Sequence, residues 1–173
     1  MKETTTFPQV SLDDLMSSYI KGSYILIAEL NIAKRIHVGS LGVTLFPESF
    51  YVYLGSALGG LKPRVKRHLT KAKKLKWHID HLLNEADVSQ VILCETERRL
   101  ECLLAQALVT KLPFIPDFGS SDCHCKSHLY FTDNKSSLEQ GINNAIAEVA
   151  LSQEHFKQLS GFENRSQDGK FNY

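Results

Sequence analysis

Two apolar segments rich in aromatic residues constrain the fold of this chain more than any other feature. Tyr24–Leu30 (YILIAEL) and Phe50–Leu54 (FYVYL) combine large aliphatic side chains with aromatic ones, a composition typical of buried strands. The second segment ends at Gly55, and Pro63 follows a few residues later. Proline suits the first turn of a helix, where its missing N–H has no intrahelical partner. The sequence therefore predicts two neighbouring strands followed by a helix that packs on them.

The remaining segments predict further strands and helices around the same core. The expected strands are a hairpin of Ile36–Gly39 with Gly42–Phe46, then Val91–Cys94 and His128–Phe131. A flexible turn is expected from Gly55 to Gly60, and a loop over Pro116–Lys126. The expected helices run from Pro63 to about Leu75, over Ile79–Asn84, from Thr96 to about Leu112, and from Ser136 to about Leu159. The predicted class is α+β: a small mixed or antiparallel sheet flanked by helices, with an added C-terminal helix.

Length and composition predict one domain in a soluble protein. The chain has 173 residues, of which 43% are hydrophobic, enough for one core. We expect residues 1–14 to be flexible apart from a short helix that starts near Ser11, residues 15–160 to form the domain, and residues 161–173 to be a disordered tail. The first fourteen residues lack the apolar region of a signal peptide, and no apolar run is long enough to span a membrane. These patterns predict a cytoplasmic location.

Positive charge is concentrated in one segment. The formal net charge is only +1, yet Lys62–Lys76 holds eight of the 20 lysines and arginines and no acidic residue. On a helix, Arg64, Arg67, His68 and Lys71 would share one face, which predicts a surface for backbone phosphates. A simply solvated face is the alternative. The residues that we expect to contact nucleic acid are Lys62, Arg67, Lys71 and Lys74.

An ordered set of motifs resembles the signature of the GIY-YIG nuclease superfamily. The motifs are Gly22-Ser23-Tyr24, Tyr53-Leu54-Gly55, Arg64 with His68 four residues later, and an acid that opens a later helix. Within this superfamily, the chain is most similar to a small uncharacterised family found alone or fused to endonuclease III-type glycosylases in archaea. The segments that carry this resemblance are Tyr51–Gly60, Lys62–Leu69, Trp77–Leu83 and Phe118–Leu129. The first motif has serine in place of isoleucine, and the predicted hairpin fills an unusually long gap between the two tyrosine motifs.

The resemblance implies a metal-dependent endonuclease that acts on DNA or RNA, with one Mg²⁺ or Mn²⁺ ion. It places Tyr24 and Tyr53 side by side, with one of them positioning or deprotonating the attacking water. It implies that Arg64 holds the scissile phosphate, that His68 assists proton transfer or phosphate binding, and that Glu101 binds the ion. It also implies a role in DNA repair and a functional link to a DNA glycosylase. A nucleic-acid-binding module that does not cleave is the alternative.

Glu101 is a candidate metal ligand on physical grounds as well. Glu97 and Glu101 lie one helical turn apart, near Leu104 and Leu108 on the apolar side of the predicted helix. A carboxylate is costly to bury unless it is paired or binds a metal. A glutamate at the boundary of the core, paired with Arg98 or a lysine, is the alternative, and Glu97 is the rival ligand.

The segment from Asp122 to His128 is rich in thiols and imidazoles. Cys123, Cys125 and His128 are chemically suited to zinc, but the spacing of the two cysteines is tighter than is usual for a structural site. A fourth ligand would come from Asp122, His124 or the more distant His78. Structural thiols in a folded loop are one alternative. A thiol-centred active site that uses His78 and Asp80 is the other.

Overall fold

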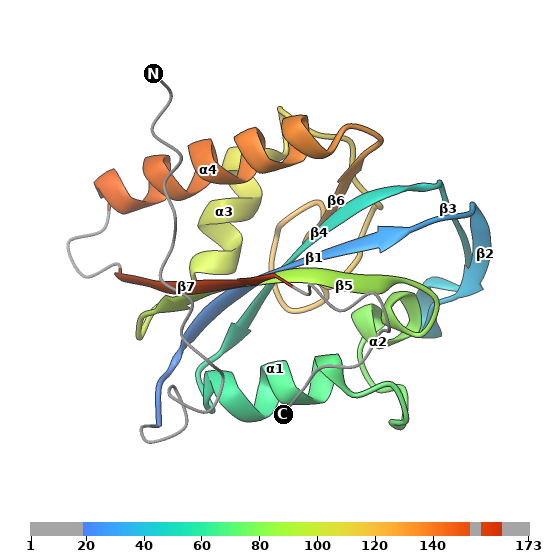
Figure 1. The fold of residues 1–173 in the computed structure, drawn as a ribbon, viewed down its shortest axis with the longest axis horizontal. Helices are drawn as coiled ribbons and strands as arrows, with labels where there is room; N and C mark the ends of the chain where they lie inside the picture. Colours follow the sequence, from blue (N-terminus) through green and yellow to red (C-terminus); the bar gives the residue numbers. More distant parts are fainter. Residues whose placement is uncertain (1–18, 153–156, 164–173) are drawn as a thin grey trace.

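The protein contains a five-stranded antiparallel sheet (Figure 1). A computed structural model describes residues 19–152 and 157–163. Strand β1 is central and pairs with β4 on one side and β5 on the other, while β6 and β7 form the two edges. The strands are β1 (Gly22–Leu30), β4 (Ser49–Ala57), β5 (Asp87–Glu95), β6 (Leu129–Thr132) and β7 (Lys157–Glu163).

The predicted hairpin between the two tyrosine segments is confirmed. Strands β2 (Lys34–His37) and β3 (Val43–Phe46) pair antiparallel as a separate two-stranded sheet, joined through a short 3-10 helix, η2, at Gly39–Leu41. Ile36 and Phe46 are buried in the core. The hairpin therefore adds to the main core although it is not part of the main sheet.

Helices cover both faces of the sheet (Figure 1). Helices α1 (Leu61–Leu69) and α2 (His78–Leu83) pack on one face, and α3 (Leu100–Leu108) and α4 (Lys135–Ser152) pack on the other. Alternate side chains of β1 point to opposite faces, so that Tyr24 and Leu26 join the α1 side and Ile25 and Ile27 the α3 side. The α+β class with helices around a small sheet is confirmed. Among the described residues, no helix has the length and apolar character needed to cross a membrane.

The basic helix is shorter than the sequence predicts, since α1 ends at Leu69 and not near Leu75. Thr70 adopts an extended conformation, and its hydroxyl donates to the carbonyl oxygen of Lys66. The Lys73 ammonium then folds back and donates to the carbonyl oxygens of Arg67 and His68. A lysine that satisfies the last carbonyls of a helix stabilises its end. Lys71 and Lys74 therefore lie in the loop after α1 and do not share its face.

Two predicted boundaries near the site are also wrong. Gly55 and Ser56 belong to β4, where they pair with β1, and the turn begins only at Leu58. Helix α3 begins at Leu100 because the Ser23 hydroxyl, from β1, accepts the Leu100 N–H. A cap from a distant strand cannot be recognised in the local sequence.

The C-terminal part of the chain differs from the prediction as well. Helix α4 ends at Ser152, so the predicted helix does not reach Leu159. Residues 157–163 form β7, which pairs with β5. Residues 161–163, predicted to belong to a disordered tail, are therefore part of the sheet. The flexible N-terminus expected at residues 1–14, the helix near Ser11 and the tail after Glu163 lie outside the described residues.

Candidate functional site

A cleft of about 400 Å³ opens where β1 and β4 meet α1, the start of α3 and the loop of residues 117–128. Four residues that the resemblance singles out line it: Tyr24, Tyr53, Arg64 and Glu101. The structure therefore brings together residues from four different elements of the chain. The other residues that line the cleft include Trp77, His78, Arg99, Gly119, Asp122 and His128.

The two tyrosines lie side by side, as the sequence predicts. Their rings belong to neighbouring strands and face the same side of the sheet, with centroids 6.3 Å apart. Tyr24 pairs with Gly55 across the strands, and a Cβ atom at Gly55 would lie 2.2 Å from the Tyr24 ring. Glycine is thus required there, because the ring occupies the space of a side chain. Burial raises the pKa of both tyrosines well above its usual value, so both hydroxyls are protonated at neutral pH.

A chain of three buried polar groups leads away from the cleft. The Tyr24 hydroxyl lies 2.7 Å from Nε2 of His68, and Nδ1 of His68 faces Oδ1 of Asp80 at 3.6 Å. An anion beside Nδ1 favours the tautomer that carries its proton there. Nε2 is then the acceptor, and the Tyr24 hydroxyl donates to it. Burial lowers the pKa of His68, which keeps the ring neutral and able to accept a proton.

Asp80 is fully buried and strongly held. Arg67 donates to Oδ2 at 2.6 Å, and the backbone N–H groups of Lys76 and Trp77 donate to the same oxygen. Burial alone would raise the pKa of this carboxyl, but His68, the two backbone amides and the Lys73 ammonium together hold the pKa well below its usual value. The sequence suggested Asp80 only as a partner of the cysteine loop. The sequence does not indicate that Asp80 contacts the His68 ring on the side opposite Tyr24.

Arg64 is the cation of α1 that lines the cleft. Its guanidinium lies 4.4 Å from the centre of the Trp77 ring and donates to the carbonyl oxygen of Ser56 at 3.2 Å. Stacking on an aromatic face orients a guanidinium and leaves its N–H edge available. Arg64 is therefore fixed in direction and is suited to hold an anion in the cleft.

Two of the four residues predicted to contact nucleic acid have partners within the protein. Arg67 binds Asp80 and the carbonyl oxygen of Lys74. Lys71 donates to the carbonyl oxygens of Leu83 and Ala86 and pairs with Asp87. Arg67 and Lys71 thus connect α1 and its following loop to α2 and the start of β5. Lys62 and Lys74 remain candidates for a phosphate contact.

Glu101 lies in the first turn of α3, and its side chain is 2% exposed. The Ser23 hydroxyl donates to Oε2 at 3.3 Å, and Nε of Arg99 donates to Oε1 at 2.8 Å. Arg99 also donates to Oδ2 of Asp122 at 2.6 Å, so one cation joins two carboxylates at the edge of the cleft. The rival ligand Glu97 is exposed, precedes the helix and does not line the cleft.

Glu101 and Asp122 bring carboxylate oxygens, the type of ligand that hard cations prefer, to the same cleft. Mg²⁺ prefers carboxylate oxygens and keeps several waters, so one or two carboxylates are enough to hold it. Glu101 and Asp122 both line the cleft and already share the positive charge of Arg99. The Arg99 side chain is 47% exposed and lies between the two carboxylates. A divalent ion bound by both carboxylates would have to displace this guanidinium.

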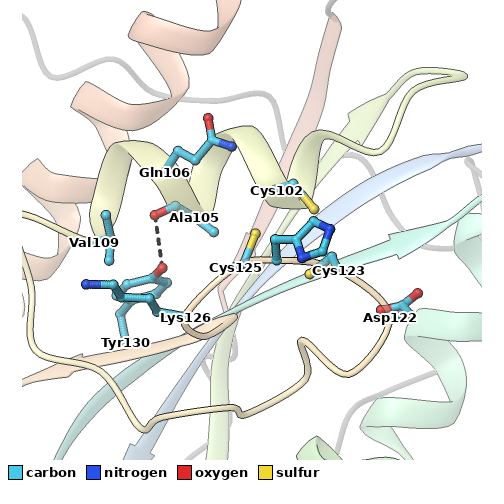
Figure 2. A pocket seen from close by; sticks show the side chains of 10 residues that line it. Cys102, Ala105, Gln106, Val109, Asp122, Cys123, Cys125, Lys126 and Tyr130 are labelled. Carbon is cyan, nitrogen blue, oxygen red and sulfur yellow. Dashed lines mark hydrogen bonds between the residues drawn. The ribbon is translucent and has the colours of Figure 1, made fainter.

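A second cluster lies beside the cleft, where α3 meets the loop. The ligand atoms of Cys102, Cys123, Cys125 and His128 all lie within 4.8 Å of one another, so the cluster could hold a metal ion. Figure 2 shows Cys102 on α3 and two loop cysteines with their sulfur atoms turned toward one another. The sequence predicted three of these four groups and missed Cys102. In the sequence, Cys102 is marked only as the residue that follows Glu101. On a helix, consecutive residues point to adjacent sides, so Cys102 does not share the direction of Glu101.

Only part of the thiol-centred arrangement comes together: His78 lines a hollow with Cys123 and Cys125, and Asp80 does not line it. His78 accepts the N–H of Gly119 through Nδ1 at 3.1 Å, and Asp80 faces His68 of α1. The imidazole beside Cys123 is that of His128, with Sγ and Nε2 3.5 Å apart. Neither Asp122, His124 nor His78 is part of the four-residue cluster.

Comparison with known proteins identifies a family without a described activity. No curated protein and no solved structure matches the chain. Residues 23–151 match a family described as "Domain of unknown function DUF123". This match includes every residue of the cleft and of the cysteine cluster named above. Because it spans well over half of the sequence, the protein belongs to the DUF123 domain family.

Proposed function

We propose that this protein is a metal-dependent endonuclease that hydrolyses phosphodiester bonds in DNA or RNA. The observation that carries the proposal is the single cleft lined by Tyr24, Tyr53, Arg64 and Glu101. It combines a hydroxyl with a proton acceptor behind it, a fixed guanidinium and a buried carboxylate. These are the groups that in-line attack of water on a phosphate requires.

Arg64 would bind the scissile phosphate. Its stacking on Trp77 fixes the guanidinium before a substrate arrives, so little reorganisation accompanies binding. Two parallel N–H bonds from a guanidinium match the spacing of two phosphate oxygens. As the phosphorus becomes five-coordinate and charge builds on these oxygens, the same bonds become stronger.

Tyr24 is the better placed of the two tyrosines to accept a proton from water. Its own proton points to Nε2 of His68, so its oxygen would act as the acceptor for a water molecule bound in the cleft. When that water attacks phosphorus, its proton passes to Tyr24 and the Tyr24 proton passes to His68. Asp80 stabilises the resulting imidazolium. The P–O bond to the leaving oxygen breaks, that oxygen takes a proton from solvent, and His68 later returns its proton through Tyr24.

Glu101, with Asp122 beside it, would hold one Mg²⁺ or Mn²⁺ ion, which supplies positive charge for the phosphate oxygens. The protein groups prepare this position: Ser23 orients the carboxylate of Glu101, and the N-terminal end of α3 favours negative charge there.

The test compares two glutamates four residues apart in the sequence, of which only Glu101 lines the cleft. Wild type, Glu101→Gln and the control Glu97→Gln are assayed on branched, nicked and single-stranded DNA and RNA with Mn²⁺. We expect Glu101→Gln to lower turnover per folded molecule by about 10²–10³-fold, while Glu97→Gln keeps wild-type activity. Cleavage that survives Glu101→Gln, or that is lost only in Cys123→Ser, would overturn the assignment.

A non-cleaving nucleic-acid-binding module is the second candidate, and one observation favours it. Arg99 already neutralises Glu101 and Asp122, so its guanidinium competes with a metal ion for both carboxylates. This alternative predicts that wild type binds nucleic acid without cleaving any of the substrates at millimolar Mn²⁺. If cleavage then appears in Arg99→Gln, the site is an endonuclease held closed by this arginine.

A further inference from the structure

We propose that Cys102, Cys123, Cys125 and His128 bind one Zn²⁺ ion as a structural site that fastens the loop of residues 117–128 to helix α3. This proposal rests on the cluster itself and is independent of the endonuclease assignment. It adds a fourth ligand, Cys102, from an element outside the cysteine-rich loop. It also identifies the type of ion and its role.

The spacing of the four groups fits a single tetrahedral ion. Zinc lies about 2.3 Å from thiolate sulfur and about 2.0 Å from imidazole nitrogen. In a tetrahedron these lengths separate neighbouring ligand atoms by about 3.5 to 3.8 Å. Sγ of Cys123 lies 3.5 Å from Nε2 of His128, and Sγ of Cys102 lies 3.9 Å from it. All four ligand atoms fall within 4.8 Å of one another, so only a small contraction is needed.

The chemistry of the donor atoms selects zinc over the hard ion proposed for Glu101. Three thiolates and one imidazole form a soft ligand set, and a tetrahedral site of sulfur and nitrogen favours Zn²⁺ over Mg²⁺ or Mn²⁺. Four protein ligands also complete the coordination of zinc and leave no open position for substrate, which is typical of a structural site.

The ion would lie directly behind the cleft. Cys102 follows Glu101 on α3, Cys123 follows Asp122 in the loop, and His128 lines the cleft. Between Pro116 and Ser127 the chain has no regular helix or strand. An ion bound by Cys102 of α3 and by the loop ligands would connect the helix to the loop. It would therefore set the distance between the carboxylates of Glu101 and Asp122, which Arg99 joins.

Elemental analysis of the protein, purified under reducing conditions and saturated with Zn²⁺ before desalting, tests the site. We expect one zinc per chain in wild type, less than about 0.2 per chain in Cys102→Ser, and an unfolding temperature that falls on chelation. His124→Ala is the matched control, because His124 is exposed within the same loop but lies outside the cluster. Cys94→Ala removes a cysteine that is buried in the core and lies outside the cluster. Both controls should keep one zinc.

A measurement on wild type alone covers the case in which Cys102→Ser fails to fold. Co²⁺ added to the metal-free protein should give the intense visible bands of a tetrahedral ion and the near-ultraviolet charge transfer from thiolate to cobalt. Zn²⁺ should displace this signal with one equivalent. Wild type that shows neither bound zinc nor a tetrahedral thiolate spectrum contradicts the proposal. Equal zinc content in Cys102→Ser and His124→Ala contradicts it as well.

Discussion

On the α1–α2 wall of the cleft, the buried charges are balanced by the protein itself. Asp80 has Arg67, Lys73 and two backbone amides around it, and His68 stands between it and Tyr24. On the wall formed by α3 and the loop, three thiols and an imidazole face one another instead. The charges of the first wall are balanced by side chains of the protein, whereas the thiol cluster of the second wall would, in the zinc proposal, be balanced by a bound ion. The two walls should therefore respond to different perturbations: mutation of charge on one side, and removal of metal on the other.

Asp80→Asn should produce the largest change in stability. The substitution leaves Arg67 and Lys73 beside a buried neutral group, and breaking a buried ion pair by removing one partner costs about 3–5 kcal/mol. We expect a loss of this size in the free energy of unfolding, measured by urea denaturation. Asp87→Asn is the control, since Asp87 is exposed and its pair with Lys71 is at the surface. A loss in Asp80→Asn no greater than that of the control would show that the wall is not held by its charges.

Arg64→Gln and Arg67→Gln should separate catalysis from stability within one helix. Both guanidiniums lie against Trp77, at 4.4 and 4.6 Å from the ring centre, but only Arg64 lines the cleft. Arg64→Gln should lower turnover by about 10²–10³-fold and leave the melting temperature nearly unchanged. Arg67→Gln should mainly lower the melting temperature. Equal effects of the two variants on turnover per folded molecule would remove the distinction.

The acid limb of the pH–rate profile should report on His68. Burial lowers its pKa from the usual value of about 6.5, and the charged groups that influence it most are Asp80, Lys73 and Arg64. The ring is therefore neutral at pH 7, and activity should fall only below pH 6.5, by about tenfold per pH unit below its pKa. Stability should change in the same sense, because the unfolded chain takes up this proton at a higher pH than the folded one. An acid limb of kcat/KM, measured with Mn²⁺, that is unchanged when Asp80→Asn removes the anion beside His68 would argue against proton transfer through His68.

The smallest expected effect concerns Lys62 and Lys74. If each contacts one phosphate, Lys62→Gln and Lys74→Gln should each reduce the slope of log affinity against log salt by about one. Lys111→Gln, which affects a lysine paired with Glu148, is the control and should leave the slope unchanged. Fluorescence anisotropy with a labelled oligonucleotide at several salt concentrations measures all three. A slope that none of the variants changes would place the phosphate contacts elsewhere.

The strands and the neighbouring tyrosines could be predicted from the sequence because their signals are local and ordered. Alternation places Tyr51 and Tyr53 on one side of β4 and Val52 and Leu54 on the other, and β1 has too many apolar residues for an exposed strand. The core could therefore be assigned from residue type alone. The end of α1 could not, because it depends on Lys73 folding back onto the helix.

The sequence does not show which partner each charged side chain binds. The run from Lys62 to Lys76 has the composition of a binding surface, yet Arg67 and Lys71 bind groups of the same molecule. Asp80 is the first acid after that run, and this was an available signal that one of the cations has an internal partner. Cys102 was missed for a related reason. A metal site drawn from two elements has no fixed spacing in the sequence.

The contact between Gly55 and the Tyr24 ring gives a way to switch the cleft off without removing any functional group. A single methyl group at position 55 would occupy the space of the ring atoms nearest the Tyr24 hydroxyl. The ring would have to rotate or the two strands would have to separate, and in either case the hydroxyl would leave Nε2 of His68. Gly55→Ala would then keep every charge and every donor while uncoupling the tyrosine from its proton acceptor, which makes it an informative inactive form for binding and structural work.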